Sequence, residues 1–117
     1  EILDICREND IGFVPYSPLG RGFLAGGIRI LDDLGADDWR RNDPRYSPEN
    51  LPKNLGVVDA VARVAARHGV SNAQVALAWL LAQGPNIVPI PGVKRRETMR
   101  DSAAADRVAL TQEDMAE

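Results

Sequence analysis

The sequence has only one cysteine, Cys6, and only one histidine, His68. A single cysteine cannot form a disulfide within the chain, which is typical of a reducing compartment, so we expect a cytoplasmic protein with Cys6 in an apolar core. One cysteine and one histidine cannot assemble a zinc site, and acidic pairs such as Asp32-Asp33 lack the spacing of a calcium loop. No apolar run reaches the ~18 residues of a membrane span. From these absences we expect no metal site and no membrane partner.

The chain also lacks a basic excess. Its 14 Lys and Arg residues stand against 17 Asp and Glu residues, for a net charge of −3 over 117 residues. Proteins that bind nucleic acid nonspecifically are usually basic, so we expect no nucleic-acid partner. The cations gather locally instead, around Arg21, at Arg40-Arg41 and at residues 94–96.

Residue patterns predict alternating helices and strands. We expect the end of a helix over residues 1–9, helices over about 54–68, 72–83 and 95–105, and a last helix starting at about 111. Ser71 and Gln74 have the spacing of a capping box, and His68 is expected to cap a helix end. Apolar runs at residues 11–16 and 87–90 predict buried parallel strands, which indicates an α/β fold.

Residues 17–53 form a long predicted loop. It contains four prolines, but also Trp39 and Tyr46, and disordered segments seldom contain aromatic residues. We therefore expect a packed loop. Trp39, Arg40 and Arg45 could shape a ligand pocket or serve only local packing, and the pattern leaves both open.

Both predicted strands end in glycine and cations. After residues 11–16 come Gly20, Arg21 and Gly22; after residues 87–90 come Pro91-Gly92 and the cations of residues 94–96. Glycine lets backbone N–H groups approach a phosphate closely, and arginine adds a fixed positive charge. Each segment alone could be an ordinary turn or a solvated basic face. Together they predict one diphosphate-bearing ligand held across neighbouring strands.

Four segments resemble one family. They are residues 15–26 (PYSPLGRGFLAG), 39–46 (WRRNDPRY), 76–84 (ALAWLLAQG) and 90–96 (IPGVKRR). They are similar to the aldo-keto reductases, which are NADPH-dependent (β/α)8 barrels. The resemblance implies that residues 1–117 are the C-terminal part of one such TIM barrel domain, with strands 7 and 8 and their helices, because a barrel needs about 250 residues.

The resemblance also implies a binding site for NADP(H). It assigns Tyr16 to stacking on the nicotinamide, and Lys94 and Arg95 to the 2′-phosphate. The positions matching the loop around the pyrophosphate and its ribose are Ser17, Leu19, Gly20, Arg21 and Gly22. The positions matching the turn beneath the adenosine are Pro91, Gly92 and Val93. Asp101 and Ser102 stand where the family often has Glu-Asn against the adenine, so recognition of the base is expected to differ.

The four catalytic residues of the family have no counterpart in this chain. In the family, the catalytic tyrosine, lysine, aspartate and histidine lie upstream of the part that residues 1–117 of this chain match. The resemblance thus implies a parent reductase of small-molecule carbonyls, whose missing N-terminal barrel is this chain's partner, and it predicts that the isolated chain is inactive. The alternatives are a noncatalytic, nucleotide-binding regulatory subunit of the same fold, and an independent α/β binding module.

Overall fold

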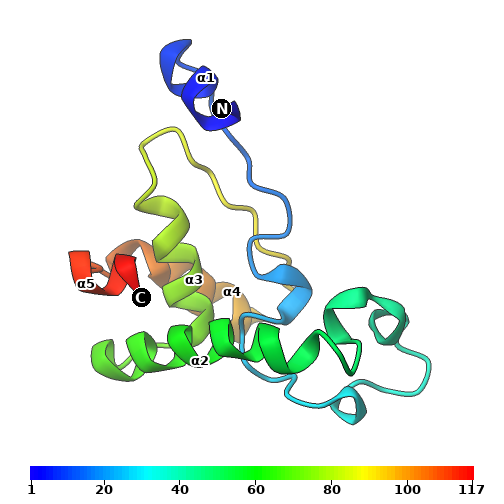
Figure 1. Cartoon of the computed structure of the whole chain (residues 1–117). Coiled ribbons are helices and arrows are strands. Elements are labelled where there is room, and N and C mark those ends of the chain that lie inside the picture. The colour runs from blue at the N-terminus through cyan, green and yellow to red at the C-terminus, as the bar shows by residue number, and fades with distance from the viewer.

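The computed structural model describes all 117 residues, and it has a helical body from which one extended segment leads to a separate short helix (Figure 1). A second extended segment runs beside the first and connects two helices of the body. The body contains α2 (Leu51–His68), α3 (Asn72–Leu81), α4 (Arg96–Ala103) and α5 (Gln112–Ala116). Helix α1 (Ile2–Glu8) lies at the far end of the first extended segment, and the second extended segment joins α3 to α4. The molecule is elongated, with principal extents of 44 × 31 × 30 Å.

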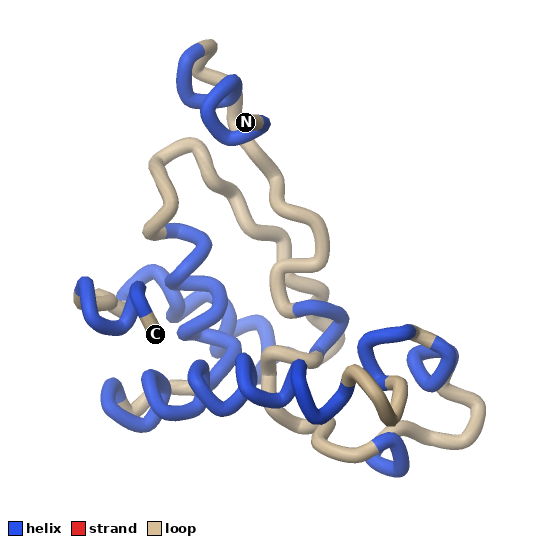
Figure 2. Tube along the Cα trace, in the orientation of Figure 1, coloured by secondary structure: helices blue, strands red, loops and turns tan.

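The two extended segments are the predicted strands, reduced to a single parallel bridge between Phe13 and Ile87. The N–H of Phe13 donates to the carbonyl of Asn86 at 2.7 Å, and the N–H of Val88 donates to the carbonyl of Phe13 at 2.9 Å. No strand is formed over residues 11–16 or 87–90, so that expectation is wrong in extent (Figure 2). Two isolated strands have too few neighbours to sustain a ladder. Val14 and Ile90 are accordingly 52% and 63% exposed.

Side-chain hydrogen bonds fasten α1 to the link between α3 and the second extended segment. Arg7 Nη2 donates to the carbonyl of Gln83 at 2.7 Å, and Asn86 Nδ2 donates to the carbonyl of Ile11 at 3.1 Å. Cys6 is buried, as expected, while Ile2 remains 68% exposed. Helix α1 is therefore held at its end but only thinly covered.

The expected helices are present, with different boundaries. Helix α2 begins at Leu51 rather than near 54, because Pro52 in the first turn needs no hydrogen-bond partner for its nitrogen. It ends at His68, and the next residue, Gly69, has a φ of 64°, the left-handed geometry expected there. Helix α4 ends at Ala103 and continues as the 3₁₀ turn η5 (Ala104–Arg107) rather than running to 105.

The predicted capping box at the start of α3 is only half formed. The Ser71 hydroxyl accepts from the N–H of Gln74 at 3.1 Å. The Gln74 side chain, however, donates to Asp101 Oδ1 at 2.8 Å instead of returning to the backbone of Ser71. A partner 27 residues away along the chain has replaced the local one.

A buried carboxylate joins α5 to the end of α2. Asp114 accepts from the N–H of Thr111 at 2.9 Å and from Arg67 Nη2 at 2.7 Å, and it lies 2.8 Å from His68 Nε2. The Thr111 backbone and the Arg67 guanidinium, in that order, hold the pKa of Asp114 well below its usual range. His68 thus sits at the helix end as expected, but its ring binds Asp114.

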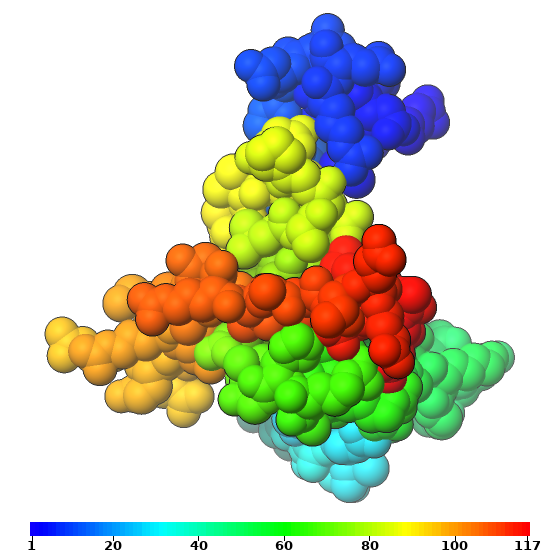
Figure 3. All heavy atoms as spheres, turned by 90° about the vertical axis from the view of Figure 1, so that its left-hand side faces the viewer, coloured from blue at the N-terminus to red at the C-terminus, as the bar shows by residue number.

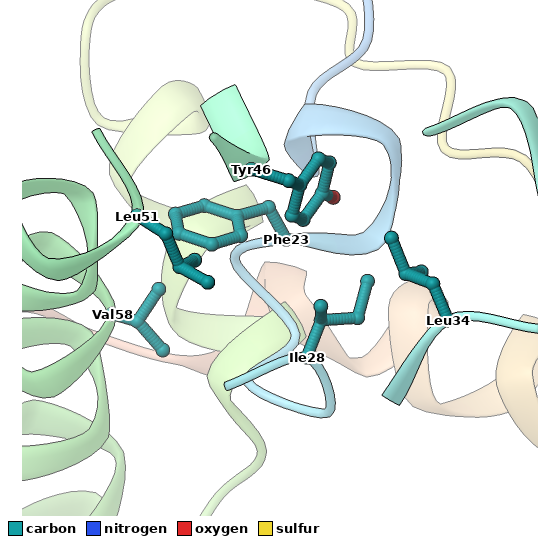
Figure 4. Packing of buried hydrophobic residues seen from close by; sticks show 6 residues of the cluster. All are labelled: Phe23, Ile28, Leu34, Tyr46, Leu51 and Val58. Carbon is teal, nitrogen blue, oxygen red and sulfur yellow. The ribbon is translucent and has the colours of Figure 1, made fainter. Parts of the chain in front are cut away.

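The long loop is packed, as the aromatic residues predicted, and it contains four short 3₁₀ turns. These turns are η1 (Gly20–Gly22), η2 (Leu31–Asp33), η3 (Trp39–Asn42) and η4 (Pro44–Tyr46). The loop shares a core with α2, in which Phe23 meets Tyr46 edge-on at 5.5 Å between ring centroids (Figure 4). Tyr46 has no exposed surface. The loop is therefore part of the folded body.

Candidate nucleotide-binding site

The parallel bridge places both glycine-and-cation segments at the same end of the extended pair. Phe13 and Ile87 are paired in the same direction, so residues 16–22 and residues 91–95 follow at the same edge. Figure 1 shows the two segments running side by side toward η1. Ligands in α/β proteins bind outside the carboxyl ends of parallel strands, which makes this edge the candidate site.

Arg21 lies at the centre of the first segment. Its Nη1 donates to Asp43 Oδ2 at 2.9 Å, and its Nη2 donates to the Tyr16 hydroxyl at 3.4 Å. Its guanidinium carbon lies 4.7 Å from the centroid of the Trp39 ring, a cation–π contact. The hydrogen bond and charge of Arg21 lower the pKa of Tyr16. Three residues that the sequence singled out, Tyr16, Arg21 and Trp39, thus form one cluster with Asp43.

Tyr16 leaves its ring free for a ligand. The residue is 83% exposed although it follows an apolar segment, and Pro15 before it is buried. An exposed aromatic face at the end of an extended segment suits stacking on a flat ring. The geometry therefore fits the role that the resemblance implies for Tyr16.

Two arginines hold the backbone of the first segment from the loop side. Arg40 Nη1 donates to the carbonyl of Arg21 at 3.0 Å, and Arg45 Nη1 donates to the carbonyl of Gly20 at 2.7 Å. Arg40 also binds Asp38, and this bond lowers the pKa of Asp38 to about 2. Of the two roles that the sequence left open for Arg40 and Arg45, the structure gives them local packing.

The backbone of this segment needs its glycines. Gly20 and Gly22 have φ values of 56° and 92°, and a Cβ on Gly20 would lie 3.3 Å from Arg45 Nη1. Ser17 and Arg21 also have positive φ, at 48° and 60°, although neither is glycine. Such strain outside glycine persists only where surrounding contacts impose it, and it is often found at ligand sites.

The second segment is open. Lys94 and Arg95 are exposed and make no ion pair, and nothing lies within 4 Å of a Cβ built on Gly92. Figure 3 shows the region around the start of α4 projecting from one side of the molecule. These cations remain available for an anion, as the 2′-phosphate assignment requires.

Asp101 and Ser102 are adjacent but differ in their hydrogen bonding. Asp101 accepts from Ser71 Oγ at 2.7 Å and from Gln74 Nε2 at 2.8 Å, so both of its oxygens are already bonded within the protein. Ser102 is 8% exposed and its hydroxyl has no hydrogen-bond partner. It borders a hollow of about 430 Å³ that Pro91 and Val93 also line. Of the two, only Ser102 has unused hydrogen-bonding capacity.

Sequence reasoning missed Asp43. It caps η4 by accepting from the N–H of Arg45 at 3.0 Å, and its other oxygen binds Arg21. The signal was present in the sequence, because Asp followed by Pro and Arg is typical of the start of a short helix. Its pairing with a residue 22 positions earlier was not visible there.

Two acidic residues of the loop are hydrogen-bonded within the protein, although Asp33 is also exposed to solvent. Asp33 accepts from the N–H groups of Arg29 and Ile30 at 2.7 and 2.9 Å, and Asp38 binds Arg40. No group of three or more His, Cys, Asp or Glu residues is placed to hold a metal ion. None of the helices has the length and apolar character that crossing a membrane requires.

Two parallel chain segments, each followed by a glycine-containing turn and cations and joined by helices, are typical of α/β barrels that bind phosphate-bearing ligands. The model of the aldo/keto reductase family matches residues 1–117. The chain therefore belongs to the aldo/keto reductase family, as its motifs indicated.

Individual relatives support the family assignment. The chain is 44% identical over 110 residues to "Aldo-keto reductase yakc [NADP(+)]" of Schizosaccharomyces pombe, covering 94% of this chain and 32% of that protein. It is 40% identical over 115 residues to "Aldo-keto reductase str7" of Strobilurus tenacellus, covering 98% and 34%. The chain thus spans about a third of the length of these relatives.

A solved structure supports the fold. The chain is similar to the thermostable aldo-keto reductase Tm1743, crystallised with the inhibitor epalrestat, with a TM-score of 0.63 and 29% identity. The match covers 97% of this chain and 31% of that protein. The neighbour belongs to a TIM-barrel family, and the helix-rich structure is consistent with part of such a barrel.

Proposed function

We propose that this chain is the part of an NADPH-dependent aldo-keto reductase that holds the cofactor, contributing strands 7 and 8 and their helices to a single barrel domain. The observation that carries the proposal is the Phe13–Ile87 bridge, which sets Tyr16 and Arg21 at the same edge as Lys94 and Arg95. The name of the Schizosaccharomyces pombe relative includes NADP(+), which supports the choice of cofactor.

The side chains fit a dinucleotide phosphate. Arg21 offers a planar fork with donors for a pyrophosphate. Gly20 and Gly22 give the η1 backbone its positive φ values. Ser17 and Leu19 precede this turn. Lys94 and Arg95 are free to bind a 2′-phosphate, with the turn at Pro91, Gly92 and Val93 beneath the adenosine and Ser102 near the base. Hydride transfer to a carbonyl carbon is the chemistry that the bound cofactor supplies.

The remaining barrel is the partner that this part requires. A groove of about 450 Å³ between α2, α3 and α5 is lined mainly by apolar side chains, among them Val61 and Trp79. Val14, Val88 and Ile90 are also half-exposed or more. Apolar surface of this extent is normally covered, and we infer that the preceding barrel units cover it in the whole protein. The 117 residues alone are then inactive, and we place the whole protein in the cytoplasm.

The test is carried out on the whole natural protein. We expect it to bind NADPH and to oxidise it in the presence of aldehydes or ketones, monitored by loss of absorbance of the reduced nicotinamide. Tyr16→Ala should weaken NADPH binding while preserving the fold. Failure to bind NADPH would refute the proposal.

Binding without turnover across a broad panel of carbonyl compounds would favour the alternative, a noncatalytic nucleotide-binding subunit of the same fold. The site residues of this chain support both functions, because both need the cofactor. The same assay therefore separates them.

A further inference from the structure

We propose that Asp43 is a displaceable internal ligand of Arg21. Its carboxylate occupies the edge of the guanidinium that an oxygen of the nucleotide diphosphate takes on binding, so Asp43 lowers the affinity of the site for nucleotide. This inference rests on the proposed function, in which Arg21 binds the diphosphate.

Two of the Arg21 nitrogens already have partners in the protein, and Asp43 is the partner that is an anion. Trp39 covers one face of the guanidinium at 4.7 Å, and Nη2 points to the Tyr16 hydroxyl at 3.4 Å. Nη1 is committed to Asp43 Oδ2 at 2.9 Å. A phosphate oxygen seeks the same kind of donor as a carboxylate, and the carboxylate also neutralises the charge that would attract it.

The bond to Asp43 is one that a ligand can replace. The Arg21 side chain is 37% exposed, whereas that of Asp43 is 12% exposed, so water reaches the pair from the guanidinium side and screens it in part. A multiply charged diphosphate is a stronger competitor than water for the same donor. Exchange of one acceptor for another therefore requires no unfolding of the loop.

Both partners stay in place while the exchange occurs. The backbone of Arg21 is fixed by Arg40, which donates to its carbonyl at 3.0 Å. Asp43 remains bound through Oδ1, which accepts from the N–H of Arg45 at 3.0 Å. Only the contact between Nη1 and Oδ2 has to change.

The experiment compares NADPH affinity in the whole natural protein, by fluorescence titration, for wild type, Asp43→Asn and Asp32→Asn. Asn at position 43 keeps an oxygen for the Arg45 N–H but loses the charge. We expect Asp43→Asn to tighten binding about two- to fivefold, the range of a partly exposed ion pair. Asp32→Asn is the matched control, because Asp32 is 84% exposed and pairs with Arg41 instead.

Two further variants test the mechanism. Asp43→Ser keeps a helix-capping oxygen, and it should reproduce the gain if the Asn variant folds poorly. In an Arg21→Ala background, Asp43→Asn should give no gain, and added salt should reduce affinity more steeply in Asp43→Asn than in wild type.

Equal or weaker binding by folded Asp43→Asn and Asp43→Ser overturns this inference and leaves the proposed function standing. The same holds if Asp32→Asn tightens binding equally. Absence of NADPH binding in wild type and all variants refutes the proposed function and this inference together.

Discussion

Arg21 and the pair Lys94–Arg95 are both cations that follow an extended segment, yet the structure surrounds them differently. Arg21 is held by Asp43, Trp39 and Tyr16 within a loop that shares a buried core. Lys94 and Arg95 are exposed and have no ion-pair partner. We call the surroundings of Arg21 the first site and those of Lys94 and Arg95 the second site. The first site is preorganised, so anion binding there exchanges one acceptor for another. At the second site, binding must order two long side chains when an anion arrives.

The largest effect is expected from a substitution that disrupts the buried core beneath the first site. Tyr46 is fully buried between the loop and α2, and its hydroxyl has no partner. Tyr46→Ala should lower the free energy of unfolding by about 3–5 kcal/mol, as truncation of large buried aromatics does. It should also weaken NADPH binding, because the loop that positions Arg21 loses its core. Thermal unfolding and NADPH titration measure both effects.

Tyr46→Phe is the matched control. Removing an unpaired buried hydroxyl while keeping the ring should leave stability unchanged or slightly raised. If Tyr46→Ala unfolded no more readily than Tyr46→Phe, the first site would not depend on its packed core.

Substitutions at the second site should change the affinity for NADPH but not the stability of the fold. Lys94→Ala combined with Arg95→Ala should weaken NADPH binding about 10- to 100-fold, since hydrogen bonds to charged groups contribute roughly 1.5–3 kcal/mol. NADH, which lacks the 2′-phosphate, should bind as before, and the melting temperature should not change. Arg107→Ala is the control, because Arg107 is exposed and its nearest acid lies at 3.9 Å. Equal losses for NADPH and NADH would place these cations elsewhere on the cofactor.

Local signals predicted much of the fold, whereas contacts between distant residues were not visible. Gly69 at a helix end and the packing of Tyr46 follow from neighbouring residues. The strands were overestimated because a strand needs partners that a local pattern does not contain. The bonds from Arg45 to Gly20 and from Arg21 to Asp43 span 25 and 22 residues. The motifs thus predicted where the candidate site lies, but not which side chain neutralises it.

The smallest expected effect concerns the hollow beside the second site, where Asp101 and Ser102 are adjacent but differently bonded. Ser102→Ala should reduce NADPH affinity about threefold without lowering the melting temperature, because the hydroxyl has no partner within the protein. Asp101→Ala should instead lower stability and leave NADPH affinity nearly unchanged. It breaks bonds to Ser71 and Gln74 that join α4 to α3, and should cost about 1–3 kcal/mol of stability with little change in affinity. The opposite pattern in melting and titration would assign the adenine contact to Asp101, and would require its carboxylate to leave α3 when the nucleotide binds.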